Sequence, residues 1–557
     1  MPSVNLVKQC RLRRHAMNAT AAAVVGFCSS VGAVEISTGN DDVQLRFDNT
    51  IRYNFGKRIE GQSSAIIGGA NFDDGDRNFK KGSTVTNRLD LLTETDLVYK
   101  KKSGIRVSAA SWYDQAYSGS FSNDSLATSN HLVNGAPAFG LSDYANRYYK
   151  GPSGEFLDAF VFTTVDLGEM PLTVRVGRHA VNWGEALLGG GAIHGNTYGQ
   201  SPLDQAKGLS TPGIEAKELY LPLNQVSAQL QATPELSLAG QYFLGWNTTR
   251  VPDAGTYLGF ADHMLNGGES LVLAPGVPGV RALRGPNLKP SDQGDWGLAA
   301  RWSPQWFDGT MGFYVRNFSD KIPQTILIPA TRQYFFNWGS DISLYGLSLA
   351  KQLGDISFGA DLNYRKNMPL VSDTVAAPSA AALPGQGDML GARGDTVHAV
   401  INALGVLPRT ALADGGSYAA ELTWNRWLKV TQGEQYFKGR PAYQAIDRVS
   451  KDYVGLAVNV APAWYQVFPG ADLSLPISYS VGLSGNSAVS SGGNKSAGSY
   501  SVGLGLDYKA QYRFDIKYVD YFGQVTKNSA GVITVPNGST ALLTDRGAVF
   551  FTFKTTF

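Results

Sequence analysis

The side chains that most often carry out catalysis are present, but not in the spacings that known catalytic motifs use. Five histidines lie beyond residue 33, namely His131, His179, His194, His263 and His398. None belongs to an H-E-x-x-H pair, and the sequence has no G-x-S-x-G elbow, P-loop or dinucleotide fingerprint. A hydrolase that assembles Ser, His and an acid from different strands stays open as an alternative. We expect a protein that is not an enzyme and needs no cofactor.

One acidic stretch could attract a cation. It reads Asn71-Phe72-Asp73-Asp74-Gly75-Asp76, and clustered carboxylates are suitable ligands for calcium. The spacing departs from that of a full calcium loop, and the distal Glu is absent. We therefore predict a solvated acidic turn and no metal site.

The first residues carry the features of a secretory signal peptide. Basic residues from Lys8 to Arg14 precede an apolar run over 16–31 and the small-residue site Val31-Gly32-Ala33. The chain then divides into a signal peptide, 1–33, and a single domain, 34–557. Both cysteines, Cys10 and Cys28, fall in the signal peptide. The mature domain would have no thiolate metal site, disulfide or cysteine nucleophile.

Two segments alternate apolar and polar residues as strands do. The apolar set of Val43–Phe55 is Val43, Leu45, Phe47, Ile51, Tyr53 and Phe55, and its polar set is Gln44, Arg46, Asp48, Thr50, Arg52 and Asn54. At the end of the chain, positions 549, 551, 553 and 557 are Val or Phe and alternate with a mostly polar set. The terminal Phe557 resembles the signal by which bacterial barrels are recognised. We expect the barrel-assembly machinery to bind it.

The rest of the chain reads as hairpins with short turns, such as 168–171 and 233–235, separated by long loops rich in Gly, Asn, Ser and Pro. The mean hydropathy is −0.14, because lipid-facing and lumen-facing residues alternate. We predict an antiparallel transmembrane β-barrel in the outer membrane of a Gram-negative bacterium. It has about eighteen strands, or sixteen if Thr396–Leu407 is a helix. The long loops are extracellular, and no plug domain is expected because the first strand begins soon after Ala33.

Charged residues on the polar faces should line the lumen. An Arg or Lys on the lipid face near mid-bilayer costs about 2–4 kcal/mol, which excludes that side. We expect most of these charges to pair across strands and a minority to contact a ligand. The lumen-lining candidates are Arg46, Asp48, Arg52, Arg106, Asp361, Arg365, Arg513, Asp515 and Lys517.

One motif is similar to a known family. The stretch Gly177-Arg178-x-x-x-x-Trp183-Gly184-Glu185, followed by Ser201-Pro202-Leu203-Asp204, resembles the proteobacterial outer-membrane barrels catalogued as domain of unknown function 1302. The resemblance covers essentially the whole mature chain. It implies a barrel whose relatives are often encoded beside lipid, steroid or aromatic catabolism and efflux-type inner-membrane transporters. It implies no enzymatic activity. The family's usual Asn-Pro-x-Asp begins with Ser201 here.

We expect Asn182–Ser210 to fold back into the lumen and narrow the pore. Its glycines let the backbone turn sharply, and its anchoring side chains would need partners such as lumen arginines. The alternative places Trp183 in the aromatic girdle at the lipid headgroups and leaves Glu185 solvated. The candidate residues for ligand contact or constriction are Trp183, Glu185, Arg178 and Asp204.

The most consistent function is passive diffusion of hydrophobic or amphipathic small molecules, of lipid, steroid or aromatic type, across the outer membrane. The alternatives are a general or sugar-selective porin, an outer-membrane hydrolase, and a loop-mediated assembly or adhesion protein. The expected partners are outer-membrane lipid and lipopolysaccharide, a small-molecule substrate, and periplasmic or inner-membrane transport proteins. The net charge of +2 argues against nucleic acid.

Overall fold

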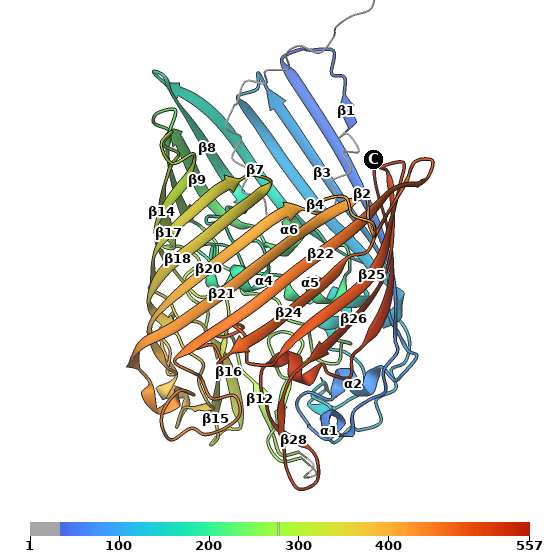
Figure 1. Ribbon diagram of the computed structural model, residues 1–557. Coiled ribbons are helices and arrows are strands. Elements are labelled where there is room, and N and C mark those ends of the chain that lie inside the picture. Colours follow the sequence, from blue (N-terminus) through green and yellow to red (C-terminus); the bar gives the residue numbers. More distant parts are fainter. Residues whose placement is uncertain (1–33, 276, 278) are drawn as a thin grey trace, which may run out of the picture.

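The structure is a computed structural model that describes residues 34–275, 277 and 279–557. The predicted signal peptide, 1–33, lies outside the described residues. The chain forms one closed antiparallel sheet, which surrounds a lumen filled by long loops (Figure 1). No helix in the described part of the chain is long and apolar enough to cross a membrane.

The wall is a meander of eighteen strands in which β23 and β24 count as one interrupted strand. The strands are β2 (Val43–Arg58), β3 (Thr84–Tyr99), β4 (Ser103–Asp114), β7 (Ser153–Leu167), β8 (Met170–His179), β9 (Leu223–Gln231), β10 (Leu236–Phe243), β13 (Trp296–Trp302), β14 (Gly309–Phe318), β17 (Ile342–Leu353), β18 (Ile356–Pro369), β20 (Arg393–Val406), β21 (Gly415–Gln432), β22 (Asp452–Phe468), β23 (Ala471–Ser474), β24 (Ile477–Ser484), β25 (Gly498–Tyr508), β26 (Tyr512–Phe522) and β29 (Ala548–Thr556).

The sheet closes between its last strand and its first. β29 pairs with β26 on one side and with β2 on the other, from Thr50 opposite Thr556 to Arg58 opposite Ala548. A short strand, β1 (Val34–Ile36), covers the part of β2 that extends beyond β29. The predicted number of eighteen strands is confirmed. The alternative helix at Thr396–Leu407 is wrong, because these residues belong to β20 apart from Leu407.

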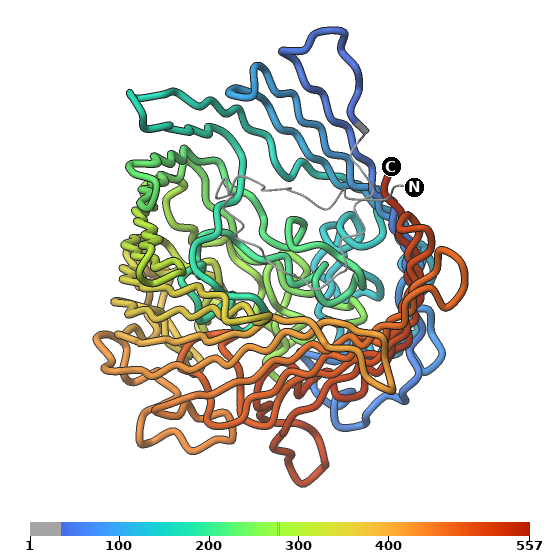
Figure 2. The backbone as a smooth tube through the Cα atoms, turned by 45° about the horizontal axis from the view of Figure 1, so that its top comes forward, coloured from blue at the N-terminus to red at the C-terminus, as the bar shows by residue number. Residues whose placement is uncertain are grey.

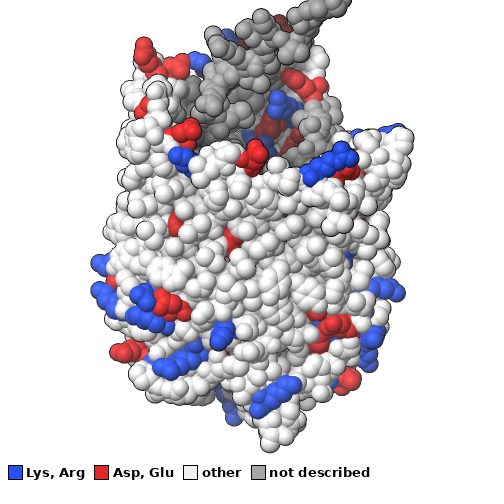
Figure 3. Space-filling model, viewed as in Figure 1, with Lys and Arg blue, Asp and Glu red and all other residues white. Residues whose placement is uncertain are grey.

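The outward face of the wall is apolar and the inward face is polar. Leu298, Ile401 and Ile516 are all more than half exposed on the outside. Lys, Arg, Asp and Glu gather near the two ends of the barrel and are sparse between them on the face in Figure 3. A band of this kind matches the hydrocarbon layer of a bilayer. The protein is therefore an outer-membrane β-barrel.

The long loops carry the remaining elements, and several enter the barrel (Figure 2). They contain α1 (Ser64–Ile67), α2 (Asp74–Asn78), η1 (Gln115–Tyr117), β5 (Leu132–Val133), β6 (Ala136–Pro137), α3 (Asp143–Ala145), η2 (Asn146–Lys150), α4 (Gly189–His194), α5 (Gln205–Ser210), α6 (Ala216–Leu219), β11 (Ser270–Val272), β12 (Arg281–Arg284), β15 (Gln324–Ile328), β16 (Gln333–Asn337), β19 (Val375–Ala376), η3 (Ala380–Ala382), η4 (Glu434–Tyr436), β27 (Val525–Lys527), β28 (Ile533–Pro536) and η5 (Ser539–Leu542).

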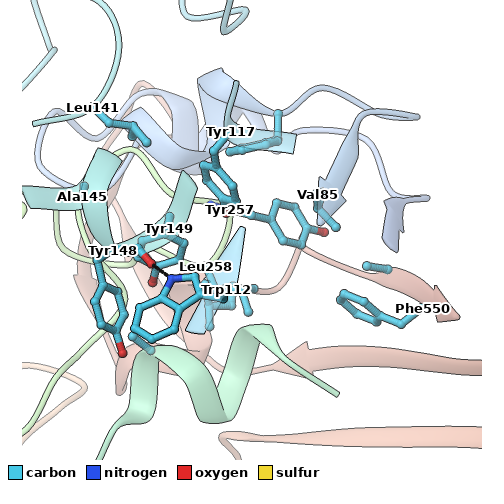
Figure 4. Packing of buried hydrophobic residues seen from close by; sticks show 14 of the residues in the cluster. Val85, Trp112, Tyr117, Leu141, Ala145, Tyr148, Tyr149, Tyr257, Leu258 and Phe550 are labelled. Atoms are coloured by element: carbon cyan, nitrogen blue, oxygen red, sulfur yellow. Dashed lines mark hydrogen bonds between the residues drawn. The ribbon is translucent and has the colours of Figure 1, made fainter. Parts of the chain in front are cut away.

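Aromatic side chains hold the loop over 115–152 against the wall (Figure 4). Trp112 on β4 packs edge-on against Tyr148, and its indole Nε1–H donates to the carbonyl oxygen of Tyr148 over 2.6 Å. Tyr117 and Tyr149 pack together in the same cluster. Rings bury large areas, and a paired indole N–H removes the penalty of burying that donor. This cluster fixes one of the loops that fill the lumen to the inner face of the wall.

The predicted solvated acidic turn is wrong. Asp73, Asp74 and Asp76 are 0 %, 3 % and 0 % exposed. Arg58 lies 2.6 Å from Asp76, and Arg546 also contacts that carboxylate. Arg58 lies outside the acidic stretch and Arg546 lies near the other end of the chain, which is why the stretch alone did not reveal its burial. No group of three or more His, Cys, Asp or Glu side chains in the described residues is arranged to hold a metal ion.

Deleting Phe557 tests its role as an insertion signal. Its backbone N–H and C=O bond to Asn49, and its ring is 47 % exposed. The nine β29–β2 residue pairs remain without it, so we expect refolding into detergent to be retained. Outer-membrane levels in cells should fall severalfold, measured by immunoblot of membrane fractions. Normal outer-membrane levels of the deletion variant would show that the barrel-assembly machinery does not need Phe557.

Candidate functional site

A segment over 180–222, which we call the lumen loop, runs from the end of β8 to the start of β9 through the interior of the barrel. It carries α4, α5 and α6, and α4 packs against β20, β21 and β22 on the opposite wall. The inward path of this segment is the arrangement that its glycine content favours, because glycine allows close approach between backbones and other groups. The lumen loop therefore crosses the interior from β8 to the opposite wall.

Two carboxylates of the wall hold the lumen loop by its backbone N–H groups. Asp361 on β18 accepts from the N–H of Glu185 and of Asn196, both over 2.9 Å. Glu421 on β21 accepts from three N–H groups near the start of α4, at distances of 2.7 to 3.1 Å. Hydrogen bonds to charged acceptors are worth roughly 1.5–3 kcal/mol each. The anchor points are thus carboxylates of the wall and backbone of the loop.

Glycine is required where these carboxylates reach the backbone. A Cβ atom at Gly191 would lie 2.5 Å from an oxygen of Glu421. At Gly184, whose φ is +100°, a Cβ atom would lie 2.5 Å from an oxygen of Asp361. Any side chain at these positions would push the carboxylate away. The glycines therefore serve as contact surfaces as well as turning points.

Donors from other strands bind the carbonyl oxygens of the same segment. Arg316 on β14 donates to the carbonyls of Asn196 and Tyr198 over 3.0 and 2.6 Å. Arg365 on β18 donates to the carbonyl of Gly195 over 3.0 Å. The backbone of 184–198 is thus bound on its N–H groups by acids and on its carbonyls by arginines.

Trp183 lies inside the barrel. Its side chain is 6 % exposed, and its indole stacks on Tyr314 of β14 with ring centroids 6.0 Å apart. A Cβ atom at Gly297 on β13 would lie 2.7 Å from the indole, so the missing side chain there makes room for the ring. Trp183 therefore does not belong to the aromatic girdle at the lipid headgroups, which was the alternative prediction.

Glu185 pairs with a wall arginine. Its carboxylate lies 3.2 Å from Nη2 of Arg301 on β13. Burial raises the pKa of Glu185, and the nearby Arg301 opposes that shift. The expected pairing of a loop carboxylate with a lumen arginine is therefore present, through an arginine that the sequence analysis did not select.

The other two candidates lie apart from this pair. Asp204 caps α5, accepting from the N–H of Lys207 over 2.9 Å, and its carboxylate lies 2.9 Å from Arg250. Lys207 in turn pairs with Glu155 of β7 over 3.0 Å. Arg178 sits in the wall opposite Ala159 and Asn224, and forms no ion pair with the described residues.

The predicted lumen charges divide into paired and unpaired groups. Arg52 pairs with Glu218 of α6 over 3.0 Å, Arg106 with Glu94 over 2.5 Å, and Arg513 with Asp515 over 2.9 Å. Asp361 and Arg365 instead bind the loop backbone, as described above. These two form no ion pair with any described residue, and neither do the other three candidates, Arg46, Asp48 and Lys517.

Two cavities lie on either side of the lumen loop. An outer cavity of about 760 Å³ extends from the loops at 438–447 and 487–498 down to Gly189, Gly190 and Glu421. An inner cavity of about 800 Å³ is lined by Trp183, Glu185 and Leu187 and by the short turn over 303–310. The residues between them, 187–190, lie next to the N–H groups of Leu187, Leu188 and Gly191 that Glu421 binds.

Two histidines join α4 to the wall. The Nδ1 atoms of His194 and His398 are 2.9 Å apart, and Nε2 of His194 lies 2.8 Å from the carbonyl oxygen of Gly492. Because a carbonyl only accepts, Nε2 of His194 carries its proton and Nδ1 accepts from His398. His398 then accepts at Nε2 from the hydroxyl of Thr396 over 2.8 Å. The contact requires one Nδ1 atom without a proton, so at most one of the two rings can be protonated while it persists.

One serine and one histidine are in contact in the wall. Nε2 of His179 lies 2.7 Å from Oγ of Ser227. The other ring nitrogen lies 3.1 Å from the carbonyl oxygen of Gly177, where a catalytic triad has a carboxylate. This pair therefore lacks the third group that orients and stabilises a catalytic histidine.

Sequence reasoning missed several site residues, namely Glu421, Arg301, Arg316, His194 and His398. Their partners lie far away along the chain, 230 residues in the case of Gly191 and Glu421. One signal in the sequence could have indicated Glu421. It lies on the same face of its strand as the small residues Ala419 and Thr423, which leave its carboxylate free to bind a group in the lumen.

Replacing Glu421 tests the anchor. Glu421→Gln removes a charged acceptor and places an N–H group near those of the loop. We expect single-channel conductance or open time in a planar bilayer to rise about tenfold, for the loss of one charge-assisted hydrogen bond. Asp507→Asn changes a lumen carboxylate that binds Arg513 instead, and serves as the matched control. Unchanged currents in Glu421→Gln and in a deletion of 187–194 would remove the loop from the conducting path.

Acid should release the lumen loop through His194. Burial lowers the pKa of His194 from 6.5 to about 4. Between pH 6.5 and 4, His194 is more protonated in the released loop than in the held loop. His194 therefore contributes its full stabilisation of the held loop above pH 6.5, and this contribution is lost as the pH falls toward 4. The other titratable or charged groups around the ring are His398, Arg365 and Tyr453.

The measurement is conductance between pH 7.5 and 4. We expect it to rise on acidification, and His194→Gln, which keeps polar contacts but does not titrate, should flatten the response. An unchanged pH response in His194→Gln would assign the effect to the wall carboxylates.

The chain was compared with known families and structures. The family model described as Protein of unknown function (DUF1302) matches residues 14–557. Comparison with curated proteins finds no match. Similar solved structures include a BenF-like porin from Pseudomonas fluorescens Pf-5, with 9 % identity, a TM-score of 0.40, and coverage of 93 % of this chain and 98 % of that chain. Acinetobacter baumannii OccAB3 has 10 % identity, a TM-score of 0.41, and coverage of 92 % and 99 %. The family match spans nearly the whole sequence, and the chain belongs to the DUF1302 family.

Proposed function

We propose that this protein is a passive channel that carries hydrophobic or amphipathic small molecules across the outer membrane, with the lumen loop as its gate. The observation that carries the proposal is the pair of cavities on either side of 187–190. Each is of the size that takes a small molecule. The barrel provides the path, and the loop provides the selective step.

The lining of the outer cavity supports an amphipathic cargo. Its charged side chains are already engaged: Lys438 pairs with Asp447, Asp373 pairs with Arg440, and Glu421 binds the loop backbone. Hydroxyl and backbone groups supply further polar contacts. Its apolar members come from both the loops and the wall, and include Phe260, Met264, Ile322, Val371, Leu456 and Val489. A surface of this kind accepts an apolar body better than a strongly hydrated sugar.

The alternatives have less support. A general porin needs an aqueous path, whereas the backbone of 184–198 crosses the interior between the two cavities. An enzyme needs a nucleophile with an oriented base, whereas His179 meets a carbonyl at its second nitrogen.

Export to the outer membrane would follow from the sequence features of 1–33, with lipid and lipopolysaccharide as surroundings of the finished barrel.

A disulfide across the gate tests the proposal. A Cβ atom at Gly190 would lie 3.1 Å from Cγ2 of Thr423 on β21, which is close enough for a cystine bridge. The sequence from 34 onward has no cysteine, so Gly190→Cys with Thr423→Cys forms the single possible disulfide of that domain. We expect the oxidised variant to lose uptake of a radiolabelled steroid or long-chain fatty acid in cells lacking other routes.

The control is the same double variant after reduction, in which uptake should return to the wild-type rate. Each single cysteine variant should transport normally under both conditions. Unchanged uptake with the bridge fully formed, verified by gel mobility of the purified barrel, would rule out the lumen loop as the gate.

A further inference from the structure

Two of the most deeply buried arginines form no direct ion pair, although Asp295 lies near Arg316, and Asp320 and Asp361 lie near Arg365. Arg58, Arg316, Arg365 and Arg546 are all less than 2 % exposed. Arg58 and Arg546 contact Asp76 over 2.6 and 3.2 Å. No carboxylate of the described residues forms an ion pair with Arg316 or Arg365. A buried charge without a partner is expensive, with an effective penalty of several kcal/mol per ion.

The loop backbone is a poor substitute for a counter-ion. Arg316 and Arg365 donate to the carbonyls of residues 195, 196 and 198, and Arg365 also donates to Oδ1 of Asn363 over 2.8 Å. Three further donors are buried with no partner, namely Nε and Nη2 of Arg316 and Nη1 of Arg365. A carbonyl oxygen carries only a partial charge. The two guanidinium groups therefore retain both charge and unused donors.

Aromatic rings border the same place. The guanidinium group of Arg365 lies 4.3 Å from the ring centroid of Tyr198, and that of Arg316 lies 4.7 Å from that of Phe318. Tyr198 and Phe318 pack in one cluster with Trp183 and Val489. Trp183 lines the inner cavity and Val489 lines the outer one. The cluster thus joins the two cavities next to the unpaired arginines.

We propose that Arg316 and Arg365 bind the carboxylate of an amphipathic substrate, whose apolar body lies on the aromatic cluster. This inference rests on the proposed channel function and specifies its substrate class. In the structure the carbonyls of 195–198 occupy the positions that the carboxylate oxygens take. A carboxylate binds guanidinium groups more strongly than a carbonyl does, because both partners are charged. Arrival of the substrate therefore favours release of the loop segment.

The test compares 3-phenylpropanoate with its uncharged amide, 3-phenylpropanamide, by calorimetric titration of the purified barrel in lipid nanodiscs. The two probes share the same apolar body and differ in charge. We expect the carboxylate to bind about tenfold more tightly, which corresponds to one charge-assisted hydrogen bond. Arg316→Gln and Arg365→Gln should each remove most of that preference. Equal binding of the two probes by the wild type would overturn the proposal.

Arg513→Gln is the matched control, since this lumen arginine is already paired with Asp507 and Asp515. It should keep the preference for the carboxylate. Arg365→Lys retains the charge and should keep part of it. If the glutamine variants fold, as judged by heat-dependent gel mobility, and still prefer the carboxylate, the assignment is wrong. If they do not fold, the wild-type comparison of the two probes decides alone.

Failure of this inference differs from failure of the channel proposal. The cystine bridge between positions 190 and 423 measures whether the loop controls passage, regardless of the head group. A barrel that is blocked by the bridge but binds both probes equally keeps its function and loses only the carboxylate site.

Discussion

Closure of the sheet between β29 and β2 is the constraint on which the rest of the structure depends. The hydrocarbon layer offers no water, so every backbone N–H and C=O of the wall needs a partner in a neighbouring strand. Pairing of Thr50–Arg58 with β29 removes the last open edges at that depth. A closed barrel of eighteen strands is too wide for its own side chains to fill. The loops must therefore supply the interior, and the lumen loop is the segment that crosses it.

The barrel was predictable from the sequence because its rules are local. Alternation of apolar and polar residues identifies the strands, and Gly, Pro or Asp marks most of the short turns, as at Gly168. The same alternation places Arg52 and Asp361 on the inner face, where the structure has them buried. The inward course of 182–210 also followed from a local feature, its glycines. These local patterns predict the course of the backbone and whether each side chain points to the lumen or to the lipid.

The contacts of the site were not predictable, because they join residues far apart in the chain. Glu185 and Asp361 are separated by 176 residues, and Leu187 and Glu421 by 234. Nothing near Asp76 indicates that Arg546 will cover it. The sequence analysis expected side chains of the loop to hold it in place. The structure has such pairs, as between Glu185 and Arg301, but it also uses charged side chains of the wall on the loop backbone. These backbone contacts leave no motif in the loop except glycine.

This choice of contacts explains how a loop can be both ordered and releasable. Asp361 and Glu421 hold N–H groups, while Arg316 and Arg365 hold carbonyls. All four wall groups are ionisable, and charged groups are well solvated by water. When the loop leaves, water or a charged solute replaces the backbone at each of them, so the cost of release is limited to the net value of each hydrogen bond, roughly 1.5–3 kcal/mol. An apolar anchor would instead expose its surface to water on release, where no new partner offsets the loss.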